Sequence, residues 1–416
     1  MKYMTRTERL PIGGAYDVIV AGGGVAGAAA AISARRGGKR VLLLEKGAIL
    51  GGLATSGLIN FFEPMDDGRG HRLMGGLCAE FFVRATRAGY DTVPDEWKRG
   101  EPGQQTGRRY ESRYSHALFA LELTELLAAE GVEILFDTLM SQPVMDGGVC
   151  TGLVVDGKSG RQFFSARMVV DATGDADVLH RAGVPTVQGK NFFTYIGFAV
   201  DIERCKKAAA SGRIEDAIYH VHGGGATLYG DGHPADVRLF EGTSNRDVSE
   251  YLILNQRRLL AAVGDQDRFS RDIVTLPGMA QLRTTRRIDG DRTLYPADAG
   301  RRFPDSIGTI GSFDEADLLY EVPYGCLVRT GFQNLITCGR SASGAEHAWD
   351  VLRVIPPAIL TGQAAGTAAA RAIDEGAPIY GIDMAGLQEA LGETGVRIHL
   401  SCGKTKKDVR ERGISC

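Results

Sequence analysis

The sequence lacks the patterns that mark metal sites, disulfide frameworks and secretion. Its seven cysteines are scattered along 416 residues, with no CxxC pair and no Cys/His spacing of a zinc site, which indicates a reduced chain without a bound metal. No N-terminal apolar segment has the length of a signal peptide. The Gly/Ala-rich stretch of residues 18–34 is too weakly hydrophobic to favour a membrane span. We therefore predict a cytoplasmic chain.

The chain also lacks an excess of charge of either sign. Lys and Arg number 48 against 51 Asp and Glu, for a net charge of -3, so no broad electrostatic attraction favours nucleic acid or an anionic membrane. We expect a small-molecule partner, and nothing in the sequence defines an oligomeric state. Glycine, by contrast, is abundant at 56 residues. It clusters in short loops beside apolar runs, which suits nucleotide-binding turns.

The first glycine cluster lies inside an alternating pattern near the N-terminus. Residues 17–21 are a β-branched run that ends in glycines, residues 25–36 are Ala-rich with only Gly27 as a breaker, and residues 40–45 form a second apolar run. This pattern predicts a β-α-β unit. Because the strands are continuously apolar, we expect a parallel sheet buried on both faces by helices.

The glycines of this unit have the spacing G-x-G-x-x-G at the strand-to-helix junction. Gly22 permits the tight turn, Gly24 lets the backbone approach a pyrophosphate, and Gly27 lets helix and strand pack closely. The helix N-terminus then faces the phosphates. Glu45 ends the second strand, where its carboxylate would accept hydrogen bonds from ribose hydroxyls and disfavour a 2′-phosphate. The unit predicts FAD or NAD, and not NADP.

Three later segments resemble flavoproteins of the glutathione reductase and fumarate reductase superfamily. They are residues 45–58 with the Gly51-Gly52 pair, residues 171–177 with an A-T-G run, and residues 334–340. With the β-α-β unit, they resemble the family of FAD-dependent oxidoreductases over most of the main domain. The resemblance implies FAD as the cofactor, held by Gly22, Gly24, Gly27, Glu45, Lys46, Gly51, Gly52, Leu53, Ala54, Ala172, Gly174, Asp175, Gly339 and Arg340.

The resemblance also implies where the flavin ring lies. In this family the ring is near the last helix, so a helix that starts at Pro357 would direct its positive dipole end at the flavin. Gly362 and Gly366 in that helix fit either close helix packing or proximity to the flavin. Residues 51–60 contain no histidine of the kind that carries covalent flavin in relatives, which favours a dissociable FAD. The sequence has no C-x-x-x-x-C pair after the first helix, which argues against a disulfide reductase. It has no second G-x-G-x-x-G motif, which argues against a separate NADPH domain.

The order of elements predicts an α/β fold. We expect a Rossmann-like FAD-binding domain, in which a parallel sheet carries a β-meander, plus an inserted α+β substrate domain. Ser115 is expected to cap a helix, and strands are expected at residues 132–136, 149–155, 168–171 and 335–338. We assign residues 14–185 to the first part of the FAD-binding domain, 186–319 to the substrate or cap domain, 320–400 to the second part, and 401–416 to a C-terminal tail.

Two candidate catalytic residues lie in the segment that the resemblance places beside the flavin. His347 would serve as a base or hydrogen-bond donor, or alternatively as a loop histidine that holds its neighbours. Arg353 would balance an anionic substrate or flavin oxygen, or alternatively pair with Asp350 or Glu346.

Basic residues of the middle domain are further candidates. Arg283, Arg286 and Arg287 suit a carboxylate or a polyhydroxylated substrate, and the same residues would also suit surface or interdomain salt bridges. His71 is a further candidate catalytic residue.

The leading hypothesis is an FAD-dependent oxidoreductase, either an oxidase or a dehydrogenase. It would transfer a hydride from a small polar metabolite, anionic or polyhydroxylated, to non-covalently bound FAD. One alternative is an NAD-binding dehydrogenase or a thiazole-synthase-like dinucleotide-binding protein. Another is a non-catalytic, flavin-binding redox sensor.

Overall fold

The computed structural model describes residue 4 and residues 7–67, 72–90, 92–93, 112–316 and 318–400. His71 and the tail predicted for residues 401–416 lie outside these ranges. Within them, no helix combines the length and the apolar character that crossing a bilayer requires.

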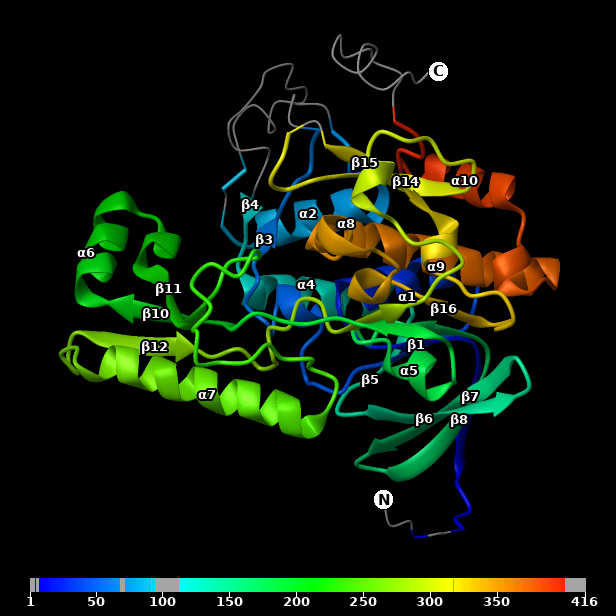
Figure 1. The fold of residues 1–416 in the computed structure, drawn as a ribbon, viewed down its shortest axis with the longest axis horizontal. Coiled ribbons are helices and arrows are strands. Elements are labelled where there is room, and N and C mark those ends of the chain that lie inside the picture. Colours follow the sequence, from blue (N-terminus) through cyan, green and yellow to red (C-terminus); the bar gives the residue numbers. More distant parts are fainter. Residues whose placement is uncertain are drawn as a thin grey trace.

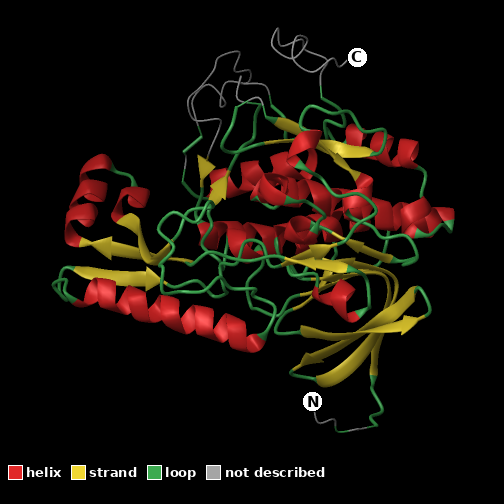
Figure 2. Cartoon of the chain, viewed as in Figure 1, coloured by secondary structure: helices red, strands yellow, loops and turns green. Residues whose placement is uncertain are grey.

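A seven-stranded sheet forms the centre of the main body (Figures 1 and 2). Its order is β5-β2-β1-β8-β7-β6, and β16 also pairs with β8. The pairs β1–β2, β1–β8, β2–β5 and β8–β16 are parallel, whereas β6, β7 and β8 form an antiparallel meander. The strands are β1 (Ile12–Ala21), β2 (Val41–Leu44), β5 (Glu133–Leu135), β6 (Leu139–Asp146), β7 (Val149–Gly157), β8 (Gly160–Asp171) and β16 (Leu335–Thr337). The predicted α/β class, with a Rossmann-like sheet and a meander, is confirmed.

The two faces of this sheet carry different layers. Val18 and Val20 of β1 pack with the helices on one face, and Ile19 and Ala21 pack with the meander and a short helix on the other. Both faces are therefore buried, as the continuously apolar strands predict. The helices of the main body are α1 (Val25–Arg36), α2 (Gly76–Ala88), α4 (His116–Ala129), α5 (Asp177–Arg181), α8 (Glu346–Leu352), α9 (Ile355–Glu375) and α10 (Met384–Glu393).

Helices α1 and α9 cross at very close range because small residues line their contact. A Cβ added at Gly362 would lie 2.1 Å from the carbonyl oxygen of Ala26, and one added at Gly366 would lie 2.1 Å from that of Ala30. Real Cβ atoms do not approach backbone oxygens so closely. Of the two interpretations of these glycines, close helix packing is therefore the one that the structure supports.

A separate layer lies beside the main body, at the left of Figure 1. It is a three-stranded antiparallel sheet of order β11-β10-β12, made of β10 (Thr194–Asp201), β11 (Ile218–Gly225) and β12 (Arg271–Thr275). Helices α6 (Ile202–Ser211) and α7 (Asn245–Gly264) accompany it. We call residues 194–275 the outer layer. Its elements fall inside the predicted substrate domain.

Three two-stranded ladders complete the fold. They are β3 (Phe61–Phe62) with β4 (Ser112–Arg113), β9 (Thr186–Gln188) with β13 (Arg286–Ile288), and β14 (Ser306–Gly311) with β15 (Leu319–Pro323). The last ladder joins residues on both sides of the predicted boundary at 319/320. The domain limits stay predictions.

Candidate functional site

A cavity of about 400 Å³ runs along the carboxyl ends of β1, β2 and β8. In parallel α/β sheets, ligands bind at this edge. Most of the cofactor-contact residues predicted from sequence lie in its wall: Gly22, Gly24, Glu45, Lys46, Gly51, Gly52, Leu53, Ala54, Ala172, Gly174, Gly339 and Arg340. Thus segments far apart in the sequence meet at one cleft. Gly27 and Asp175 are not part of this wall.

The three glycines of the first turn have different roles. Gly22 has φ +110°, and a Cβ there would lie 2.3 Å from the carbonyl oxygen of Ala172. A Cβ at Gly27 would lie 1.9 Å from the carbonyl oxygen of Gly22. Gly24 differs, because a Cβ there meets no protein atom within 4 Å. Gly22 and Gly27 therefore serve the fold of the turn, and Gly24 leaves free space in the cavity.

Glu45 ties this turn to the loop after β2. One carboxylate oxygen accepts a hydrogen bond from the backbone N–H of Gly23 at 2.8 Å, and the other accepts one from the N–H of Gly47 at 2.6 Å. A carboxylate is thereby fixed at the end of β2. This is the position at which dinucleotide-binding folds receive the ribose hydroxyls.

Asp171 is a supporting residue that the sequence prediction did not single out. Its buried carboxylate accepts hydrogen bonds from the N–H of Thr173 at 3.0 Å, the Thr173 hydroxyl at 2.6 Å and the N–H of Leu179 at 2.9 Å. Burial raises the pKa of Asp171 to about 6, against the effect of these hydrogen bonds. Asp171 therefore shapes the turn that presents Ala172 and Gly174 to the cavity.

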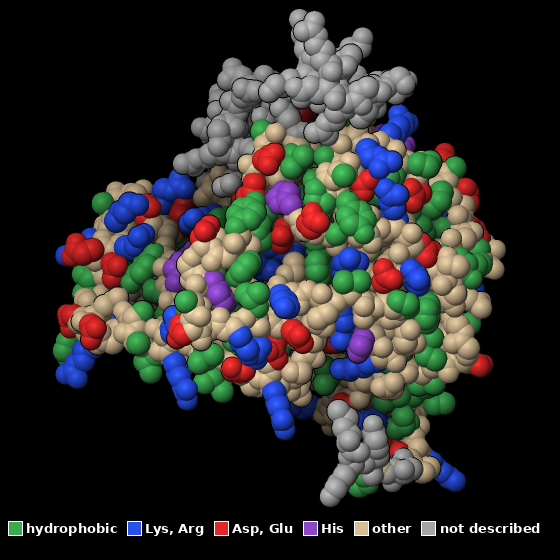
Figure 3. Space-filling model, viewed as in Figure 1, with side chains coloured by type: hydrophobic (Ala, Val, Ile, Leu, Met, Phe, Trp, Pro, Cys, Tyr) green, Lys and Arg blue, Asp and Glu red, His purple; other side chains and the backbone are tan. Residues whose placement is uncertain are grey.

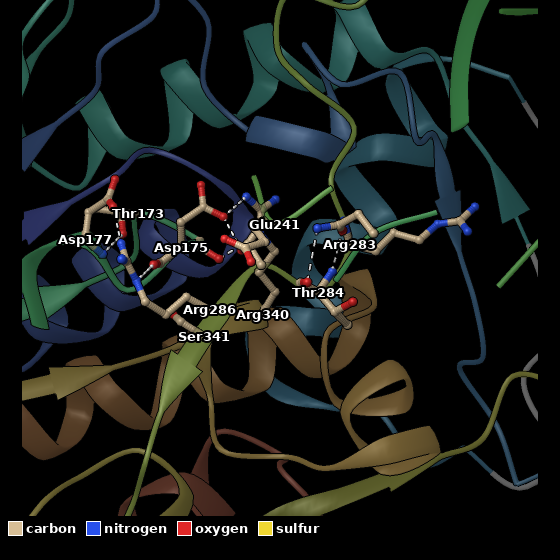
Figure 4. Close-up of polar contacts among 12 residues, drawn as sticks. Thr173, Asp175, Asp177, Glu241, Arg283, Thr284, Arg286, Arg340 and Ser341 are labelled. Atoms are coloured by element: carbon tan, nitrogen blue, oxygen red, sulfur yellow. Dashed lines mark hydrogen bonds and ion pairs between the residues drawn. The ribbon is translucent and has the colours of Figure 1, made fainter. Parts of the chain in front are cut away.

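Asp175 links this turn to Arg340, in the segment that follows β16 (Figure 4). Its carboxylate forms an ion pair of 2.6 Å with Arg340 and also accepts a hydrogen bond from Thr285. Arg340 donates a second hydrogen bond, of 2.7 Å, to the carbonyl oxygen of Gly174. The ion pair thus joins the A-T-G turn to the segment after β16. Asp175 does not line the cavity itself, but it positions Arg340, which does.

The three clustered arginines separate into two groups. Arg286 pairs with Asp177 at 2.7 Å, and Arg287 donates to the Ser343 hydroxyl at 2.9 Å while its guanidinium lies over the Trp349 ring. These two are buried structural residues, in line with the salt-bridge alternative for Arg286. Arg283 is different, since its side chain extends away from Asp175 and Asp177 in Figure 4.

Arg353 lies between α8 and α9, just before α9 begins. It lines the cavity together with Ile355 and Ala358 of α9. Its guanidinium pairs with Asp350 at 2.7 Å, and burial lowers its pKa. The predicted ion pair with Asp350 is present, and Arg353 is also one of the residues that line the cavity. The positive end of the α9 dipole adds to this charge.

His347 lies in α8 and does not line the cavity. Its Nε2 is 3.1 Å from the Ser312 hydroxyl, and its ring centroid is 5.9 Å from that of Phe313. The loop that holds Ser312 also bonds to the outer layer, because the hydroxyl of Tyr229 donates to Asp314. His347 is thus attached to the place where the outer layer meets the main body.

The sequence prediction missed the segment that covers the cavity. Gly278 and Met279 line it, and the N–H of Gly278 donates to the carbonyl oxygen of Ser56 at 2.8 Å. Buried Gln281 follows, and its side-chain amide donates to the carbonyl oxygens of Gly57 at 2.7 Å and Ile196 at 3.0 Å. A glycine after Pro277 was the one local signal. The contacts themselves depend on the tertiary fold.

The fold and the glycine-lined cleft define a dinucleotide-binding protein. A protein-family model described as FAD dependent oxidoreductase matches residues 17–195 and 257–391. The chain belongs to this family: it is an FAD-dependent oxidoreductase, and FAD is its cofactor. This family membership supports the FAD-dependent hypothesis over the NAD dehydrogenase, thiazole-synthase-like and non-catalytic alternatives. No curated protein matches the sequence.

Several solved structures match most of this chain at low sequence identity. A geranylgeranyl bacteriochlorophyll reductase-like protein from Thermoplasma acidophilum has a TM-score of 0.45 and 16% identity, over 92% of this chain and 85% of that one. The p-nitrophenol 4-monooxygenase PnpA from Pseudomonas putida DLL-E4 has a TM-score of 0.45 and 15% identity, over 91% and 84%. A flavocytochrome c3 fumarate reductase has a TM-score of 0.38 and 14% identity, over 86% and 78%.

The residues of the cleft fit FAD. Gly24 leaves open space where a pyrophosphate needs close backbone approach, and Glu45 is fixed at the strand end that receives the ribose. Lys46 and Arg353 add positive charge at two places in the wall. The chain would therefore hold the adenosine half at the β2 end and the flavin half at the α9 end.

Proposed function

We propose that this oxidoreductase transfers a hydride from a small polar metabolite, anionic or polyhydroxylated, to non-covalently bound FAD. The observation that carries the proposal is that Arg353 lines the cavity beside the start of α9. FAD, when bound, supplies the hydride acceptor. Arg353 and the helix dipole would stabilise the negative charge that accumulates at this end of the cleft.

Non-covalent binding is supported by the composition of the wall. Among the described residues that line the cavity there is no histidine, and Cys338 is the one thiol. Burial raises the pKa of Cys338, which disfavours the thiolate needed for a covalent link. The apolar side chains of Leu53, Met279 and Ile355 also line the cleft and would exclude water from the reacting groups.

We assign proton transfer from the substrate to His347. The imidazole is held by Ser312 next to Phe313, and α8 carries it together with Asp350, the ion-pair partner of Arg353. His347 lies outside the described wall of the cavity, so its direct contact with the substrate is part of the proposal. A positioned general base of this kind contributes about 10²- to 10⁴-fold to a rate.

The test is anaerobic photometry of the yellow holoprotein against a panel of metabolites. A substrate is expected to bleach the flavin absorbance, and His347→Ala is expected to keep FAD but slow bleaching by about 10²- to 10⁴-fold. His180→Ala, at an exposed position in α5, is the matched control and should bleach at the normal rate. Unchanged bleaching in His347→Ala would remove the residue from the mechanism. Failure of every small polar metabolite would reject the hydride-transfer proposal.

A further inference from the structure

A second cavity, of about 550 Å³, lies where the main body meets the outer layer. The main body contributes Asn60 and residues of the β3–β4 ladder to its wall, and the outer layer contributes residues of β10, β11 and α6. Figure 1 shows β3 and β4 on the side of the main body nearest the outer layer. Among the described residues, none lines both this cavity and the cofactor cleft. We call it the interlayer cavity, and its size suits a small molecule.

Asn60 brings an unpaired polar atom to this wall. Its side-chain N–H donates to the carbonyl oxygen of Tyr114 at 2.7 Å, which sets the orientation of the amide. The side-chain oxygen accepts no hydrogen bond from any described residue, although Asn60 is only 4% exposed. A buried acceptor without a donor is destabilising, and such atoms are rare in folded proteins. A ligand that donates a hydrogen bond would satisfy this oxygen.

Three rings form an apolar part of the same wall. Phe198 and His220 are stacked, with ring centroids 5.1 Å apart and an interplanar angle of 11°. Phe61 of β3 meets His220 edge-on at 6.3 Å, so a ring of the main body contacts the outer layer. Burial and the charges of Arg113 and His222 lower the pKa of His220 to about 4, so the imidazole is neutral at pH 7. These rings offer a surface on which a flat ring can pack.

Two guanidinium groups of the wall lack a carboxylate partner. Arg113 belongs to the main body, and its guanidinium carbon lies 5.1 Å from the centroid of the Phe61 ring. Arg204 belongs to α6 and lies 4.8 Å from the centroid of the Tyr219 ring. Neither forms an ion pair with a described residue. The wall therefore offers one free cation from each of the two regions.

The other charged groups of the wall are already paired. Lys207 pairs with Asp216 at 2.7 Å, and Glu215 pairs with Arg213. Figure 3 shows basic and acidic side chains intermixed over α6, at the left of this face. The two unpaired guanidinium groups favour an anion. Because two carboxylates share the wall, they repel a singly charged carboxylate less than a doubly charged phosphate.

We propose that the interlayer cavity binds an aromatic carboxylic acid that also carries a hydroxyl or amino group. The carboxylate would accept hydrogen bonds from Arg113 and Arg204, whose planar guanidinium groups suit it. The ring would pack against Phe61 and the stacked pair, and the hydroxyl or amino group would donate to Asn60. Both regions of the molecule contribute to the site. It goes beyond the proposed function, because binding there requires no hydride transfer.

The test is isothermal titration calorimetry of the FAD-loaded protein with 3-hydroxybenzoate, for which we expect saturable binding. 3-Hydroxybenzamide lacks the charge and should bind about tenfold more weakly. Benzoate, which lacks the donor, should lose about threefold to tenfold, and cyclohexanecarboxylate, which also lacks the flat ring, should lose more. Absence of binding, or equal affinity for the acid and the amide, would overturn the proposal. Equal affinity for benzoate and 3-hydroxybenzoate would remove Asn60 from the site.

Substitutions of the two guanidinium groups locate the bound acid. Arg113→Gln and Arg204→Gln should each weaken the binding of 3-hydroxybenzoate about tenfold, because a charge-assisted hydrogen bond is lost. Both side chains are exposed, so we expect the fold and the FAD content to stay unchanged. Arg257→Gln is the matched control, since Arg257 is exposed on α7. Equal affinities of the three variants would show that the acid binds elsewhere, whatever the outcome for hydride transfer.

Discussion

The main body and the outer layer are packed in different ways. In the main body, backbone meets backbone: Gly362 lies against Ala26, and Gly22 against Ala172. In the outer layer, a small cluster of large side chains that includes Phe240 and Tyr251 packs with the flanking Phe193 and holds the elements together. Several large apolar side chains there are also exposed, among them Leu260 at 71% and Phe269 at 78%. A cofactor of fixed shape requires the first kind of fit, and the cavity lies in the main body.

The largest difference between the two regions is expected in FAD retention when a glycine at an open position in each region is replaced by valine. Gly24→Val adds a side chain that meets no protein atom but fills the cavity, so we expect a folded, colourless protein whose FAD affinity is about a hundredfold lower. Gly264→Val, at an equally open position at the end of α7, should keep its FAD. Circular dichroism and the yield of FAD released by heating check both variants. Yellow Gly24→Val protein would contradict the position of the cofactor.

A second comparison uses two helical glycines of the main body. Gly362→Ala forces α9 away from α1, and we expect it to lower the free energy of unfolding by about 1–3 kcal/mol, the usual cost of overpacking. Gly392→Ala lies in α10, where a Cβ meets no atom within 4 Å. It should raise that free energy by about 0.5–1 kcal/mol, because alanine favours a helix over glycine. Urea unfolding of the FAD-saturated proteins measures both, and effects of the same sign would show that the α1–α9 contact tolerates a methyl group.

The smallest effect is expected where the two regions touch. The hydrogen bond to Asp314 raises the pKa of Tyr229 to about 12, so the phenol stays protonated at neutral pH and donates across the contact. Tyr229→Phe removes this exposed bond, at a cost below about 1 kcal/mol. We expect a rise in KM of at most about fivefold with little change in stability. Tyr219→Phe, within the outer layer, is the control, and an equal KM change in both variants would argue against a role for the contact.

The sequence predicted the main body well because its signals are local. Alternating apolar runs and glycines specify β1, α1 and β2, and Ser115 does cap α4, accepting a hydrogen bond from the N–H of Leu118. Strand β6 was missed because Pro143 interrupts its pattern, and the structure places β6 at the edge of the sheet, where proline is tolerated. Helix α2 begins at Gly76, directly after its N-cap residue Gly75, and was also missed, since two glycines normally signal a loop.

The site was predictable only where one short segment makes the contact. The glycine turns reach the cavity through their own backbone, so motif spacing located them. The roles of Arg283, Arg286 and Arg287 could not be separated, because sequence does not reveal which guanidinium meets a carboxylate such as Asp177. Gly278 reaches the cavity only through the fold of a segment that no motif marks.

The wall of the cleft draws on almost the whole described chain, from Ala21 to Ala358. During synthesis the β-α-β unit of β1, α1 and β2 leaves the ribosome long before β16 and the start of α9. The nascent chain therefore presents the glycine turn long before the flavin end of the cleft exists. FAD retention therefore reports that the chain has been synthesised and folded at least through the start of α9.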